Sequence, residues 1–113
     1  MALPQHKPIV GRFADKIAIV TGGTAGIGLA TAAELIKEGA AVTITGLPKD
    51  GNAVEEELHQ LGGDVLCLLG DMADDDFCRQ VVVKTVAQWG RVDCLVNNAF
   101  SFLAKALDAT RED

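Results

Sequence analysis

The sequence predicts one α/β domain whose parallel sheet is covered by helices on both faces. The chain has 113 residues, which suits a single compact domain. Short apolar runs alternate along it with segments of helical periodicity. The runs are apolar almost throughout, as in parallel strands that are buried on both faces. Because crossovers between parallel strands are right-handed, few topologies remain, and the expected strand order is 3-2-1-4. Unrelated α/β domains share this alternation, so it leaves the function open.

The predicted strands are short runs rich in β-branched and other apolar residues. They cover residues 17–20, 41–45, 65–69 and 92–96. A helix is expected after the first strand, because apolar residues recur there at i, i+3, i+4 and i+7. These residues are Leu29, Ala32, Ala33 and Ile36. Gly39 stands where a left-handed residue is expected to stop this helix.

The second and third helices are predicted from apolar faces bounded by glycines. The face of the second contains Val54, Leu58 and Leu61. This helix is expected to end at Gly62-Gly63. The third is expected to begin at the successive aspartates 74–76, since carboxylates are favourable at a helix N-terminus, and to end at Gly90. Its predicted inward face holds Cys78, Val81, Val82, Thr85 and Trp89. Thr110 could cap a fourth helix.

The charge and the lengths of the apolar runs limit which classes of binding partner are expected. The formal net charge is −6 and no basic stripe is present, so a nucleic-acid partner is not expected. No apolar run approaches the roughly 20 residues of a membrane span. Residues 1–14 are expected to form a leader without the apolar core of a secretory signal, and residues 15–113 the domain. A cytoplasmic location is the default expectation.

The cysteines predict neither a metal site nor a disulfide framework. Cys67, Cys78 and Cys94 are odd in number and widely spaced, and no close Cys/His pair accompanies them. Cys67 and Cys94 lie in the apolar runs and are expected to be buried in strands. Reduced thiols in a cytosol-like compartment are the expected state.

A glycine-rich turn, TGGTAGIG at residues 21–28, joins the first strand to the first helix. Ligands of open α/β sheets bind beyond the carboxyl ends of the strands, and a helix start offers N–H groups that suit a phosphate. A Walker A loop would need Lys-Ser or Lys-Thr after its last glycine, whereas Leu29-Ala30 follows here. The spacing also differs from G-x-G-x-x-G. The turn favours a nucleotide phosphate site, although tight packing of strand against helix would also call for glycines.

Four motifs together resemble the short-chain dehydrogenase/reductase family. They are the glycine spacing of residues 21–28, GDM at 70–72, GRVD at 90–93 and NNA at 97–99. The resemblance covers about residues 13–113 and implies a Rossmann-type fold. It further implies an NAD(P)-dependent oxidoreductase, in which a hydride moves between the nicotinamide and a carbonyl or alcohol carbon.

The resemblance also implies which residues contact the cofactor. The residues around its phosphates would be Gly22, Thr24, Ala25, Gly26, Ile27 and Gly28. Asp71 would hydrogen-bond the adenine amino group, with Met72 beside it. Asn97 and Ala99 would lie near the inner ribose and tie their loop to the sheet, although an asparagine after a strand could simply satisfy backbone groups. Phe100 replaces the glycine that usually follows, and its ring could crowd the nicotinamide end or shape the substrate pocket.

The choice between NAD(H) and NADP(H) is harder to infer from the sequence. Family members that use NAD usually carry an acid at the end of the second strand, which binds the ribose 2′-hydroxyl. Here the sequence is TGLPK at residues 45–49, which slightly favours NADP(H) over NAD(H). Leu47 and Ala25, however, stand where members that use NADP often have basic residues. Lys49 could reach a 2′-phosphate or could be a solvated turn residue.

The residues that perform the family's chemistry are not found. The family uses a tyrosine to transfer the proton, a lysine three or four places later and a serine that orients the carbonyl. This chain has no tyrosine, and Ser101 follows the fourth strand rather than the fifth. No catalytic residue is assigned, and the chain is expected to be inactive by itself, as a fragment truncated after the fourth strand.

Three interpretations stay open. In the first, the chain is an incomplete copy of an oxidoreductase. In the second, it is a short non-catalytic module that binds a dinucleotide or a partner. In the third, it is an α/β domain that binds no dinucleotide, and neither NADPH nor NADH would stabilise it. The fourth strand would be an apolar edge, and Phe100, Phe102 and Leu103 would lack cover, so self-association is expected.

Overall fold

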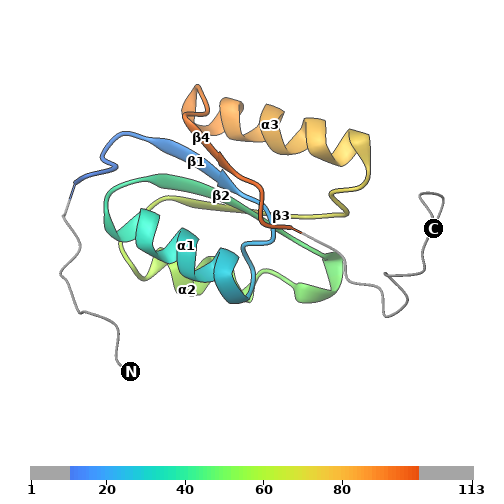
Figure 1. The fold of residues 1–113 in the computed structure, drawn as a ribbon, viewed down its shortest axis with the longest axis horizontal. Helices are drawn as coiled ribbons and strands as arrows, with labels where there is room; N and C mark the ends of the chain where they lie inside the picture. Colours follow the sequence, from blue (N-terminus) through green and yellow to red (C-terminus); the bar gives the residue numbers. More distant parts are fainter. Residues whose placement is uncertain (1–10, 100–113) are drawn as a thin grey trace, which may run out of the picture.

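The computed structural model describes residues 11–99, which form a four-stranded sheet with helices on both sides (Figure 1). The strands are β1 (Ile17–Val20), β2 (Ala41–Gly46), β3 (Val65–Leu69) and β4 (Cys94–Val96). The helices are α1 (Gly26–Lys37), the 3₁₀ turn η1 (Pro48–Asp50), α2 (Ala53–His59) and α3 (Asp75–Trp89).

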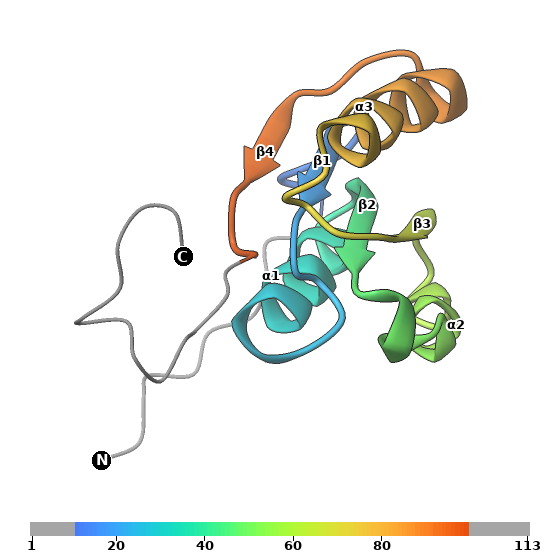
Figure 2. The same ribbon diagram turned by 90° about the vertical axis from the view of Figure 1, so that its right-hand side faces the viewer.

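The sheet is parallel and has the order β3-β2-β1-β4, as the sequence predicts. Val20 pairs with Ile44 on one side and with Val96 on the other. Helices α1 and α2 lie on one face and α3 on the opposite face, which Figure 2 shows in end view. All strands therefore end at the same edge, and the loops that follow them are brought together there.

The core lies between the sheet and the helices α1 and α2. Each residue of β1 is buried, and so are the four residues 42–45 of β2. Ala32 and Ile36 of the predicted apolar face are buried, and Leu29 and Ala33 pack against the same cluster. Gly39 follows the helix with φ +104°, and its N–H donates to Ile36 O at 3.0 Å, which confirms the predicted stop.

Helix α2 is shorter than predicted. Val54 and Leu58 face the core, but the helix ends at His59, and Leu61 is 39% exposed. Leu61 N bonds to Leu58 O at 3.0 Å, so the chain tightens into a turn before it reaches Gly62. The prediction that Leu61 shares the buried face was wrong for this reason.

Helix α3 has the predicted ends but a narrower buried face. Asp74 caps it by accepting a hydrogen bond from Asp76 N at 2.9 Å, and Gly90 ends it in the left-handed conformation. Val81 and Thr85, four residues apart, are buried against the sheet, whereas Val82 is 49% exposed. The prediction that Val82 faces inward was wrong. The buried residues Val81 and Thr85 form one row along α3, and Val82 lies one position outside this row.

Strand β4 is shorter and more exposed than predicted. It begins at Cys94 rather than at residue 92, and Asp93 N bonds to Ile17 O at 2.8 Å just before the strand. Within residues 11–99, β4 has a neighbour on only one side, and Leu95 is 56% exposed. Cys94 is also exposed, so the expectation that it is buried was wrong, while Cys67 is partly buried.

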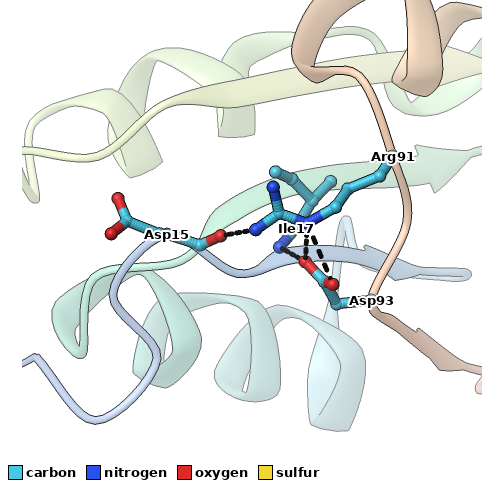
Figure 3. Close-up of polar contacts among 4 residues, drawn as sticks. All are labelled: Asp15, Ile17, Arg91 and Asp93. Atoms are coloured by element: carbon cyan, nitrogen blue, oxygen red, sulfur yellow. Dashed lines mark hydrogen bonds and ion pairs between the residues drawn. The ribbon is translucent and has the colours of Figure 1, made fainter.

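A cluster of polar contacts fixes the start of β4 beside β1 (Figure 3). Asp93 Oδ2 accepts from Ile17 N at 2.8 Å, and Arg91 Nε donates to both oxygens of Asp93 at 3.0 Å. Arg91 Nη2 also donates to the carbonyl of Asp15. The backbone bond from Ile17 and then the bond from Arg91 hold the pKa of Asp93 below its ordinary value.

This lowered pKa predicts a pH-dependent contribution to stability. A carboxyl group with a lower pKa in the folded state stabilises the protein above its unfolded pKa, and that contribution is lost as the pH falls through the folded value. We expect Asp93→Asn to lower the free energy of unfolding at pH 7, and the difference from wild type to shrink below about pH 4. Urea denaturation at both pH values measures this.

Asp15→Asn is the matched control, because Asp15 contributes only its backbone oxygen to Arg91 and asparagine tolerates its φ of +63°. An Asp93→Asn deficit that is as large at pH 3 as at pH 7 would contradict the assignment.

The described part of the predicted leader contacts the domain. Arg12 Nε lies 2.6 Å from Glu38 Oε1, and Phe13 packs against the core. The boundary at residue 14 stays a prediction. Phe100, Phe102, Leu103 and Thr110 lie outside the described residues. Among residues 11–99, no helix is long and apolar enough to cross a membrane, and no cluster of His, Cys, Asp and Glu could hold a metal ion.

Candidate functional site

A cleft of about 870 Å³ opens at the carboxyl edge of the sheet, where the loops after all four strands meet. Its volume is within the range of small-molecule sites, about 300–1,000 Å³. The cleft is lined by Gly22, Thr24, Ala25, Gly26, Ile27, Thr45, Gly46, Leu47, Asp50, Gly70, Asp71, Met72, Ala73, Asn98 and Ala99. Ligands of open α/β sheets bind at this edge, so its position favours a binding site.

The glycine-rich turn is held to its neighbours by two buried threonines. Thr45 Oγ1 accepts from Gly22 N at 3.1 Å, and Thr45 O accepts from Gly23 N at 2.9 Å. Thr21 Oγ1 accepts from the backbone N–H groups of Asn98 and Ala99, each at 3.0 Å. The floor of the cleft is thus cross-linked between β1, β2 and the loop after β4.

The N-terminus of α1 faces the cleft without a side-chain cap. Ala25 is the N-cap residue, no side chain bonds to the first turn, and the first turn has no acidic residue. A Cβ added at Gly26, which has φ +57°, would meet nothing within 4 Å, so the cleft is open there. The first backbone N–H groups of a helix have no partner within it and carry partial positive charge. They are suited to hold a phosphate.

Gly28 brings α1 against the turn. A Cβ at this position would lie 2.2 Å from Gly22 O and 2.6 Å from Asn98 Nδ2. Asn98 Nδ2 in turn donates to Gly22 O at 3.2 Å. Gly28 is buried and does not line the cleft; its role here is to permit the close approach that shapes it.

At the β3 side, Asp71 and Met72 line the cleft. Asp71 Oδ1 accepts from Ala73 N at 2.8 Å, and Asp71 O accepts from Asp74 N at 2.9 Å, so the loop into α3 is ordered by its own hydrogen bonds. Asp71 is exposed and Met72 partly buried. Together they offer an acceptor and an apolar surface, which is what an adenine ring with its amino group requires.

At the β2 side, Asp50 folds back toward the turn. Its Oδ2 accepts from Leu47 N at 2.8 Å and from Thr24 Oγ1 at 3.1 Å. This carboxylate links the loop after β2 to the glycine-rich turn across the cleft.

The structure brings together all of the sequence-predicted site residues except two. Gly28 lies behind the turn, and Asn97 does not line the cleft. The neighbouring Asn98 lines it instead and bonds to the turn. Sequence reasoning assigned no site role to Thr21, Thr45, Asn98 or Asp50. Thr21, Thr45 and Asn98 are polar residues at the ends of apolar strands, and this position is the sequence signal that could have identified them.

The cleft combines two features that a dinucleotide site requires. The open, uncapped start of α1 offers N–H donors, and Asp71 on the β3 side offers an acceptor beside the apolar Met72. Consistent with this geometry, the sequence model described as short chain dehydrogenase matches residues 16–111. The chain belongs to the short-chain dehydrogenase family. Members of this family use nicotinamide dinucleotides, and the fold of this chain is that of an oxidoreductase of this family.

Individual similar proteins agree with this assignment. The chain is 43% identical over 91 residues to an uncharacterised oxidoreductase, YhdF, of Bacillus subtilis, covering 79% of this chain and 32% of the relative. A short-chain dehydrogenase structure from Mycobacterium smegmatis superposes with a TM-score of 0.83 at 30% identity, over 98% of this chain and 48% of that one. The apo glucose dehydrogenase of Caenorhabditis elegans gives 0.74 at 35% identity, over 86% of this chain and 42% of that one. The chain therefore spans about a third of the length of the curated relatives it matches.

Proposed function

We propose that this chain binds NAD(P) in the cleft at the carboxyl edge of the sheet and belongs to an oxidoreductase that acts on a carbonyl or alcohol. The observation that carries the proposal is the uncapped start of α1, facing a cleft that is lined by eight of the ten predicted nucleotide-binding residues. When bound, the cofactor would supply the hydride chemistry. The chain's own residues would bind and orient it.

Three parts of the cofactor would have matching groups in the cleft, namely the pyrophosphate, the adenine and the inner ribose. The backbone N–H groups at Gly26 and Ile27 would hold the pyrophosphate, and Asp71 would accept from the adenine amino group. Ala99, which Thr21 holds in place, would lie toward the inner ribose. The proton transfer of the family would fall to residues in further sequence, because this chain contains no tyrosine.

The choice between NADP(H) and NAD(H) is a separate proposal about the same cleft. The absence of an acid at Gly46 supports NADP(H), as the sequence predicts. In the structure, however, the carboxylate of Asp50 lies at that end of β2, where it bonds to Thr24 and Leu47, and an acid at this place favours NAD(H). A cytoplasmic location also stays a prediction from sequence.

Calorimetric titration of the protein with NADH and with NADPH tests the proposed function. We expect saturable binding of at least one of them with a dissociation constant of about 1 μM to 1 mM, the range in which enzymes commonly hold substrates. Absence of saturable binding of either nucleotide over this range would overturn the proposal.

The second candidate is a non-catalytic dinucleotide-binding or interaction module that self-associates. The exposed Leu95 and Cys94 on β4 support it, because an apolar strand with unpaired backbone groups is a template for pairing with another chain. Sedimentation that shows a clean monomer, together with a sharp unfolding transition, would contradict self-association.

A further inference from the structure

The end of β2 has no room for the acidic side chain that hydrogen-bonds the ribose 2′-hydroxyl in many dinucleotide sites. A Cβ at Gly46 would lie 2.4 Å from Thr24 Cγ2 and 2.8 Å from Thr24 Oγ1. The same Cβ would lie 3.1 Å from Asp50 Oδ2. A carboxylate from elsewhere in the chain therefore already lies where the side chain of residue 46 would begin.

The turn η1 places this carboxylate. Asp50 N donates to Leu47 O at 2.9 Å, which closes the turn, and Asp50 Oδ2 returns to accept from Leu47 N at 2.8 Å. The bond from Thr24 Oγ1 fixes the carboxylate against the glycine-rich turn. Within residues 11–99, Asp50 Oδ1 makes no hydrogen bond, so one oxygen of a positioned carboxylate remains available at the cleft.

The charge of the cleft lining also disfavours a 2′-phosphate. Among the described residues, the lining includes the two carboxylates Asp50 and Asp71 and no Lys, Arg or His. Lys49, the candidate for a 2′-phosphate in the sequence, is exposed and is not part of the lining. A 2′-phosphate placed beside Asp50 would meet like charge with no cation in the lining to offset it.

We propose that Asp50 determines the cofactor form, and that it selects NAD(H) by accepting a hydrogen bond from the ribose 2′-hydroxyl and by repelling a 2′-phosphate. This inference rests on the proposed function, namely dinucleotide binding in the cleft. It reverses the preference for NADP(H), which depended on the lack of an acid at position 46 and could not account for a carboxylate that folds back from position 50.

The test is to compare the dissociation constants of NADPH and NADH, measured by calorimetry, for wild type and for Asp50→Asn. Asparagine keeps an oxygen that can accept from Leu47 N and Thr24 Oγ1, but it removes the charge. We expect wild type to bind NADH at least about 10-fold more tightly than NADPH. In Asp50→Asn this ratio should fall to within about 3-fold, mainly through tighter binding of NADPH.

Lys49→Gln is the matched control, since it removes a neighbouring charge from the same turn, and it should change the ratio by less than about 2-fold. Wild type that binds NADPH as tightly as NADH, or an Asp50→Asn ratio equal to that of wild type, would overturn the inference while leaving dinucleotide binding intact. Failure of wild type to bind either nucleotide would overturn the proposed function itself.

A second measurement needs no variant. Salt screens the repulsion between a carboxylate and a phosphate, so the wild-type preference for NADH should weaken between about 0.02 and 0.5 M ionic strength. If a lysine read the 2′-phosphate, added salt would instead shift the ratio of affinities further toward NADH. That result, or a ratio that does not change with salt, would contradict the assignment.

Discussion

Gly28→Ala should abolish most dinucleotide binding while leaving a folded protein. The added methyl group would lie 2.2 Å from Gly22 O, a backbone atom, and 2.6 Å from Asn98 Nδ2. Neither can give way without moving the turn, because Gly22 N is bonded to Thr45 and Asn98 N to Thr21. Helix α1 would have to move away from the turn, and its first N–H groups would move with it. A hydrogen bond to a charged group contributes about 1.5–3 kcal/mol, so the loss of one N–H contact to the pyrophosphate should lower the affinity for NADH at least about 10-fold.

The matched control for Gly28→Ala is Gly63→Ala. A Cβ at Gly63 would also clash, at 2.3 Å, but with the Cγ2 atom of Ile36 and away from the cleft lining. Both variants should lose about 1–3 kcal/mol of stability through overpacking, whereas only Gly28→Ala should lose affinity. Calorimetry with NADH, at a temperature where both variants are folded, separates the two effects. Equal affinities for Gly28→Ala and wild type would show that the turn does not hold the phosphates.

Thr85→Val should be the more damaging of two substitutions in one buried pair. The hydroxyl oxygens of Thr43 and Thr85 lie 2.8 Å apart, and both side chains are fully buried between β2 and α3. Thr85 Oγ1 donates to Val81 O at 2.6 Å, so its proton is engaged and Thr43 must be the donor of the pair. Thr85→Val leaves the Thr43 hydroxyl buried without its acceptor, for an expected cost of about 1–3 kcal/mol.

Thr43→Val should cost less, about 1 kcal/mol, because Thr85 keeps its bond to Val81. The double variant should be less destabilised than the sum of the two, since it leaves no hydroxyl unpaired. Urea denaturation of the four proteins gives the coupling energy. Thr31→Val, which removes a similar bond to Ile27 O at an exposed site, is the control and should change stability by less than about 0.5 kcal/mol. Equal costs of Thr43→Val and Thr85→Val would contradict the proposed direction of the hydrogen bond, and additive effects would contradict the bond itself.

The sheet and its order could be predicted because local patterns report on them directly. The residues of β1 are apolar and β-branched or small, and the glycine-rich turn follows immediately, so both the strand and its end are visible in the sequence. Gly39 and Gly90 stop their helices with positive φ, as expected. The cleft followed from the topology, because parallel strands place their loops at one edge.

The remaining features depend on single positions in the folded chain, which periodicity does not resolve. Val82 is exposed because α3 contacts the sheet through one row of residues, and Cys94 is exposed because β4 has one neighbour in the described part. Asn98 rather than Asn97 reaches the turn, a difference of one residue in a loop. Asp50 reaches Thr24 only because η1 turns its side chain back, and no sequence spacing reports that turn.

Binding of a dinucleotide by the start of α1 and the turn before it can be observed residue by residue. The measurement is amide chemical-shift mapping of the labelled protein during titration with NADH. We expect saturable shifts of the amides of Gly22, Gly26 and Ile27, which line the cleft, and constant positions for the amides of Gly62 and Gly90, which do not. Saturable shifts confined to residues away from the cleft, or no saturable shift at all, would contradict it.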